Sequence, residues 1–247
     1  MSAAELLASL AILAVAALTQ GVFGLGFAMV ATPLLALFLD YRSAVVLSAV
    51  PMLMLAGNWL LANRSALRQS GVPWQLLPGI VLGSAIGVWL HVALPERMAL
   101  LLLAMLLAFS VILPWGLEQI RTDVSLASRR ATPIFGVMAG VTETTLNVGA
   151  PFLVLFGGLG RLTRHQQFIA LNTCFFVGKV IQLSILAMTP WPVPLWTLIF
   201  AVTVSMVFYR LGDRLAGQFP EVAFRRLLGA FLSFMAACLV LRAALMA

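Results

Sequence analysis

Charged residues are scarce in this sequence. Only 9% of its 247 residues are charged, whereas 62% are hydrophobic. Because soluble domains carry about 25% charged residues, this composition excludes an ordinary water-soluble fold and indicates an integral membrane protein. Apolar runs near twenty residues long recur along the chain, which favours a bundle of helices over a barrel of alternating strands. We therefore expect one all-α transmembrane domain, 1–247, in a lipid bilayer.

Cysteine and histidine are nearly absent. Cys174 and Cys238 form no CxxC motif, and the two histidines, His91 and His165, are far apart in the sequence. The sequence therefore predicts no disulfide, no metal site and no cofactor. A net charge of +7 would suggest nucleic-acid binding in a soluble protein. Here the arginines fall between apolar runs, where they act as topology signals, so we expect no nucleic-acid partner.

The apolar runs predict where the chain crosses the membrane. They cover 4–19, 22–39, 43–62, 74–93, 97–117, 131–143, 146–160, 166–189, 192–210 and 222–246. The first two together would make one helix of about 54 Å, well beyond a hydrocarbon core of about 30 Å. They must therefore fold back or break.

The distribution of arginine predicts how the runs are connected. If 4–39 and 131–160 each return to the side they entered and the other six runs cross, eleven arginines share one side and three the other. The larger group is Arg64, Arg68, Arg121, Arg129, Arg130, Arg161, Arg164, Arg210, Arg214, Arg225 and Arg226. The positive-inside rule makes that side cytoplasmic and both termini non-cytoplasmic. Two full crossings per pair would give the same sidedness, but the short runs 131–143 and 146–160 favour re-entrant hairpins.

The two halves of the chain resemble one another. Residues 29–38 align with 147–156 at an offset of 151 − 33 = 118, which matches Pro33 with Pro151. At that offset a lane of small residues, Gly79, Gly83 and Gly87, falls on Thr197, Ala201 and Ser205. Each half then holds a hairpin and three crossings, and because three is odd the halves must be inverted. We predict repeat one at about 1–117, a cytoplasmic linker at 118–130 and repeat two at about 131–247, an architecture typical of alternating-access transporters.

Each predicted hairpin has a tip that precedes a half-helix, at 19–26 and 142–147. Free backbone N–H groups and the positive dipole end of such a half-helix can bind an anion near the middle of the membrane. We therefore predict that the two tips face each other and bind substrate. The candidate residues are Gln20, Gly24, Gly26, Thr142, Thr144, Thr145, Asn147 and Gly149. The alternative is that the glycines only permit tight helix packing.

Two charged residues lie within long apolar regions. Glu143 is the one acidic residue well inside such a region, and Lys179 is the only lysine. We predict that Glu143 couples a proton, although it could instead cap the half-helix or pair with a cation. Lys179 either attracts an anionic substrate or pairs with Glu143, and a static Glu143–Lys179 bridge is the alternative. Asn172 lies seven residues before Lys179, near its helix face, and joins the substrate-binding candidates.

The small-residue lane at 79, 83 and 87 has a packing interpretation. Residues with little side chain at four-residue spacing let two helices approach closely. We expect this contact within the chain, with a homodimer interface as the alternative.

The motifs together resemble a known family. The glycine-rich tip that leads to Pro33, and the glycines at 136 and 140 that lead to Gly149-Ala-Pro151, are similar to the TauE/SafE sulfite exporter family. The resemblance covers essentially the whole chain. It implies a permease for sulfite, sulfonates or other small organosulfur anions in a bacterial inner membrane. In that membrane the sidedness predicted from arginine would make both termini periplasmic. The second tip is usually glycine-rich in that family, whereas residues 142–147 here carry polar side chains.

These observations predict a secondary transporter for a small anion with proton coupling. A channel-like anion conduit is the main alternative. An intramembrane enzyme would need a nucleophile, a metal set or an acid–base pair, and only Glu143 with Lys179 could supply one. The sequence does not decide between import and export.

Overall fold

The computed structural model describes residues 2–69, 72–119, 132–160, 162–218 and 220–246, and these contain helices and no strands. The helices are α1 (Ala3–Phe23), α2 (Phe27–Leu35), α3 (Tyr41–Ala62), α4 (Arg64–Gln69), α5 (Val72–Ala93), α6 (Glu96–Gln119), α7 (Thr132–Thr145), α8 (Ala150–Leu159), α9 (Arg164–Leu186), α10 (Leu195–Arg214) and α11 (Glu221–Leu245). Seven of them are long and apolar enough to cross a membrane. The chain is therefore a multi-pass, all-helical integral membrane protein, as its composition predicts.

Six of the seven long helices, α3, α5, α6, α9, α10 and α11, are the predicted crossings, and the seventh is α1. At 21 residues α1 is longer than a re-entrant arm requires, whereas α2 has only nine residues. Helix α1 extends beyond the predicted apolar run 4–19 at both ends. A capping box of Ser2 and Glu5 begins α1, and Gly24 in the left-handed conformation ends it. The second hairpin has two short arms, α7 with 14 residues and α8 with 10.

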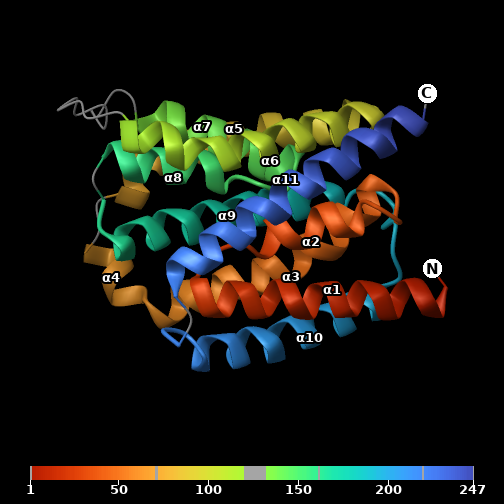
Figure 1. Ribbon diagram of the computed structural model, residues 1–247, viewed down its shortest axis with the longest axis horizontal. Coiled ribbons are helices and arrows are strands. Elements are labelled where there is room, and N and C mark those ends of the chain that lie inside the picture. The colour runs from red at the N-terminus through yellow and green to blue at the C-terminus, as the bar shows by residue number, and fades with distance from the viewer. Residues whose placement is uncertain (1, 70–71, 120–131, 161, 219, 247) are drawn as a thin grey trace.

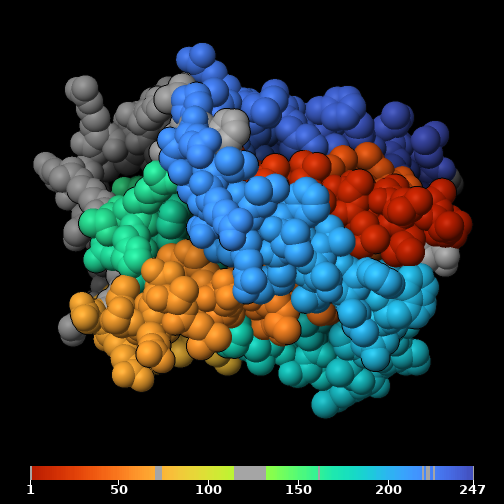
Figure 2. All heavy atoms as spheres, turned by 90° about the horizontal axis from the view of Figure 1, so that it is seen from below, coloured from red at the N-terminus to blue at the C-terminus, as the bar shows by residue number. Residues whose placement is uncertain are grey.

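The helices of the two halves pack in matching pairs. Helix α1 lies along α10, α7 lies along α5, and α6 lies along α11. Figure 2 shows α1 and α10 side by side on one face of the molecule. Under the predicted repeat, α1 corresponds to α7 and α10 to α5, so the first two pairs are equivalent. This pairing is what an inverted repeat would produce, and the repeat itself stays a prediction.

Both termini lie at one end of the molecule, and α4 lies at the other (Figure 1). Residues 120–130 of the predicted linker, which include three of the counted arginines, lie outside the described residues, as does Arg161. Many large apolar side chains point outward from the long helices, for example Trp89 at 68% exposed and Phe234 at 65%. Such a surface suits contact with lipid tails.

The small-residue lane on α5 contacts α7. A Cβ atom added to Gly79 would meet the carbonyl oxygen of Pro133, and one added to Gly83 would meet that of Val137. The predicted close packing therefore lies within the chain. Because α7 covers this lane, the homodimer interface considered for it is ruled out there.

Candidate functional site

The second tip joins α7 to α8 and holds the carboxylate of Glu143. The Glu143 side chain is fully buried, and its Oε2 accepts a hydrogen bond of 2.8 Å from the backbone N–H of Gly149. A Cβ atom at position 149 would lie only 2.8 Å from the Glu143 Cβ, so glycine is required for this approach. Glu143 therefore caps the N-terminus of α8, where the helix dipole favours negative charge.

Lys179 reaches the same carboxylate from the middle of α9. Its Nζ lies 2.8 Å from Glu143 Oε1, and both side chains are 0% exposed. Nζ also donates to the backbone oxygen of Glu143 and to Gln182 Oε1, each at 2.9 Å. Gln182 in turn donates to the backbone oxygen of Thr144 at 2.8 Å. Nζ therefore makes two hydrogen bonds and one ion-pair contact, and in this conformation Lys179 is held by Glu143 and Gln182.

The Glu143–Lys179 pair matches the alternatives named in the sequence analysis, a helix cap and a static bridge. Glu143 caps a half-helix and pairs with a cation, and Lys179 forms a buried bridge instead of presenting a free charge. Such a pair is stable only while both partners remain, because either charge alone in a dry site costs about 3–5 kcal/mol. The carboxylate of Glu143 therefore occupies the position that suits an anion: a helix N-terminus beside a lysine.

The threonines of the second tip fix its position against its neighbours. Thr144 Oγ1 donates to the backbone oxygen of Ser84 at 2.9 Å, and Thr145 Oγ1 donates to that of Gly87 at 3.0 Å. Thr142 Oγ1 donates to Met138 of its own helix. These hydroxyl groups are thus directed at backbone acceptors, and in this conformation they serve packing.

Asn147 ties the tip to the first half of the chain. Its φ is +62°, in the left-handed region that asparagine tolerates. Its Nδ2 donates to Thr32 Oγ1 at 2.7 Å and to Ser48 Oγ at 2.8 Å, and all three side chains are fully buried. The sequence interpretation missed Thr32 and Ser48 because it searched apolar runs for charged groups and amides. Hydroxyl residues inside those runs were the available signal.

The first tip is closed by Gln20. Its Nε2 donates to the backbone oxygen of Gly24 at 3.0 Å, and its Oε1 accepts from the N–H of Phe27 at 3.1 Å. Gly24 and Gly26 have φ of +76° and +117°, which explains why glycine is needed at both. Gln20 therefore caps α2 much as Glu143 caps α8, but with a neutral amide and no lysine.

The hydrogen bonds of the described residues do not link the two tips directly. No hydrogen bond between described residues joins 20–26 to 142–149; the second tip instead contacts α2 one turn beyond its start, through Thr32. The Asn172 Nδ2 donates to the backbone oxygen of Phe168 at 2.9 Å. The predicted convergence of two half-helix ends on one anion therefore stays a prediction.

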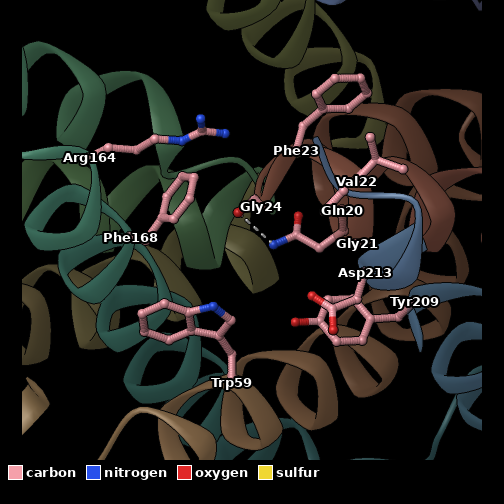
Figure 3. A pocket seen from close by; sticks show the side chains of 11 residues that line it. Gln20, Gly21, Val22, Phe23, Gly24, Trp59, Arg164, Phe168, Tyr209 and Asp213 are labelled. Carbon is pink, nitrogen blue, oxygen red and sulfur yellow. Dashed lines mark hydrogen bonds between the residues drawn. The ribbon is translucent and has the colours of Figure 1, made fainter. Parts of the chain in front are cut away.

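A cavity of about 160 Å³ opens beside the first tip (Figure 3). The residues that line it are Gln20, Gly21, Val22, Phe23, Gly24, Trp59, Arg164, Phe168, Tyr209, Asp213 and Ala216. The Arg164 guanidinium lies 5.4 Å from the centre of the Phe168 ring. In Figure 3 this pair lies on one wall, and Tyr209 and Asp213 lie on the opposite wall. The sequence interpretation named Arg164 only as a topology signal and did not single out the others.

Residues 9–239, nearly the whole chain, match the family described as "Sulfite exporter TauE/SafE". No curated protein and no solved structure matches the chain. The matched family is one of membrane transporters and not of enzymes. With its multi-pass helical fold and its match over residues 9–239, the chain belongs to the TauE/SafE sulfite exporter family.

Proposed function

We propose that this protein is a secondary transporter that moves a small organosulfur anion together with a proton. Sulfite and the sulfonates are the substrates that the family suggests. The observation that carries the proposal is the position of the Glu143 carboxylate, which lies at the α8 N-terminus and 2.8 Å from Lys179. This arrangement binds an anionic group that belongs to the protein, and a substrate anion can replace it.

The replacement links the anion to a proton. When a substrate anion takes the place of the carboxylate beside Lys179, Glu143 loses its counterion in a buried site. An unpaired buried carboxylate is costly, so Glu143 binds a proton as it leaves. The anion and the proton are then carried together, and when the anion departs the carboxylate returns to Lys179 and releases the proton. The exchange works in both directions, so it serves import and export equally.

Alternating access provides the movement. The equivalent pairs α1–α10 and α7–α5 let one half rock against the other around the second tip. The excess of arginine at the α4 end supports a cytoplasmic position for that end, and hence periplasmic termini in a bacterial inner membrane. A channel-like conduit is less well supported, because Glu143 and Lys179 are both 0% exposed and leave no open path between them.

Flux into proteoliposomes tests this function. Purified protein is reconstituted, and uptake of sulfite, sulfoacetate and chloride is measured over a range of concentrations and with an imposed pH gradient. We expect saturable uptake of at least one sulfur oxoanion, accelerated by a proton gradient in the same direction, and no uptake with Lys179→Met. Absence of saturable flux for every sulfur oxoanion would refute the proposal. Steady conductance that does not saturate would instead establish a channel.

A further inference from the structure

One face of α9 leads from the cavity to the ion pair. Arg164, Phe168, Asn172, Phe175 and Lys179 fall within an arc of about 80° at 3.6 residues per turn. The face extends over about 22 Å at 1.5 Å per residue. Along it the side chains become progressively more buried: Arg164 is exposed, Phe168 is half-buried, Asn172 is 2% exposed and Lys179 is 0% exposed. The α9 face therefore runs from a positive charge at the surface to a positive charge in the core.

The cavity occupies the exposed end of this face. It is bounded by the ends of α1, α3 and α10 and by the start of α9. These segments lie toward the α4 end of the molecule, opposite both termini (Figure 1). The described side chains that line it include the Arg164 guanidinium, the Trp59 indole, the Tyr209 hydroxyl and the Asp213 carboxylate (Figure 3). The guanidinium, the indole N–H and the hydroxyl are groups that can donate hydrogen bonds to a small oxoanion.

Phe168 closes the inner side of the cavity. A Cβ atom on Gly24 would lie 2.8 Å from the Phe168 ring, so the ring rests on the bare backbone of the first tip. One turn further along α9, Asn172 donates to the backbone oxygen of Phe168 but does not line the cavity. The ring therefore separates the cavity from the deeper part of the α9 face.

We propose that this cavity is an outer binding site for the sulfur oxoanion, and that Phe168, resting on Gly24, is the gate between it and Lys179. The inference rests on the proposed transport function and adds an access route on the α4 side. Arg164 attracts the anion to the cavity, and Asp213 on the facing wall limits its affinity so that the anion can leave again. Rotation of the Phe168 side chain away from Gly24 opens the way to Asn172 and Lys179.

Cysteine modification tests the gate without requiring transport. In a C174A/C238A background, Ala216→Cys places a thiol in the cavity and Asn172→Cys places one behind Phe168. The probe is 2-sulfonatoethyl methanethiosulfonate, an anionic thiol reagent. We expect rapid modification at position 216 and slow modification at position 172. Phe168→Ala should accelerate modification at position 172 on the order of tenfold, equivalent to about 1.4 kcal/mol, and leave position 216 unchanged.

The matched control is Phe168→Trp, which keeps a ring over Gly24 and should keep position 172 protected. Equal modification rates at position 172 with Phe, Ala and Trp at position 168 would overturn the gate. Because this readout is chemical, it decides the gate even if reconstituted wild-type protein carries no anion, a result that would refute the transport function alone.

Transport kinetics test the outer site. Arg164→Gln should raise the KM for the anion about three- to tenfold with little change in kcat, because the residue acts before the transport step. Asp213→Asn should lower the KM, and Arg164→Lys should restore part of the affinity. If neither Arg164→Gln nor Asp213→Asn changes the KM, the cavity does not bind substrate.

Discussion

At the scale of single residues, the second tip depends on two charges that need one another. Glu143 and Lys179 are both fully buried, and the carboxylate receives a backbone N–H as well as the ammonium group. In the first tip Gln20 caps the start of α2 in a similar way, with a neutral amide. A cap at this position therefore does not require charge, and the presence of an ionisable pair points to transport.

Removing one charge should harm the fold more than removing both. Lys179→Met leaves a carboxylate in the core without a counterion, and we expect a loss of about 3 kcal/mol in the free energy of unfolding. The double variant Glu143→Gln/Lys179→Met keeps an acceptor for Gly149 N–H and should come within about 1 kcal/mol of the wild type. Denaturation in mixed micelles, followed by tryptophan fluorescence, measures both. A double variant as unstable as Lys179→Met would contradict this account.

The proton dependence of transport should reside in Glu143. Glu143→Gln retains the oxygen that caps α8 but cannot bind or release a proton. We expect this variant to transport the anion at a rate that no longer responds to pH between about 5 and 8 and no longer responds to a proton gradient. Initial rates in proteoliposomes at a series of pH values provide the measurement. A pH profile identical to that of the wild type would assign the coupling to another group.

Residue types were enough to single out Glu143 and Lys179 in the sequence, but not to decide whether they form an ion pair with each other. An acid and a lysine inside apolar runs are conspicuous because each is costly in lipid. Whether Lys179 faces substrate or Glu143 depends on the rotation of α9 against α7, which no local pattern encodes. The same limit applies to Phe168, which is one of 16 phenylalanines and gains its position only from contact with Gly24.

At the scale of elements, the long helices follow from the apolar runs because length and hydropathy alone decide whether a segment can cross lipid. The arms of the first hairpin were less predictable. Helix α1 extends to Phe23 because Gly24 provides its C-terminal cap. The sequence has glycines at 21, 24 and 26, and only the φ of +76° at Gly24 identifies which of them ends the helix. The expected meeting of the two tips stays a prediction, because their distance depends on how deeply each hairpin inserts.

Close packing between elements gives a prediction with an internal control. Gly83 lies against α7, where an added Cβ would be 2.8 Å from the Val137 Cα. Gly83→Ala should therefore destabilise the protein by about 2 kcal/mol through overpacking. Gly229 on α11 has nothing within 4 Å of an added Cβ, so Gly229→Ala should be neutral or slightly stabilising. Thermal unfolding in detergent compares the two; similar losses of stability would contradict the packing between α5 and α7.

At the scale of the whole molecule, helices of one predicted half pack mainly against helices of the other. The first helix of each predicted half lies along the fourth main helix of the other, as α1 does on α10 and α7 on α5. Neither half therefore has a complete set of neighbours on its own. The six most extensive helix contacts, α5–α7, α1–α10, α6–α11, α5–α9, α3–α9 and α3–α10, all join one predicted half to the other.

The sidedness of the chain is a prediction from its arginine distribution and can be measured directly. Both termini lie at the end opposite α4 (Figure 1), and the arginine excess predicts that the α4 end is cytoplasmic. In a C174A/C238A background, cysteines placed at exposed Ser2 and Ala244 should react with a membrane-impermeant maleimide applied outside spheroplasts. A cysteine at exposed Ser65 on α4 should react only after the membrane is permeabilised. Reaction of the Ser2 and Ala244 positions from opposite sides would exclude a fold in which both hairpins return to the side they entered. Reaction of Ser65 from outside, with both termini protected, would reverse the orientation and place the Arg164 cavity on the periplasmic side.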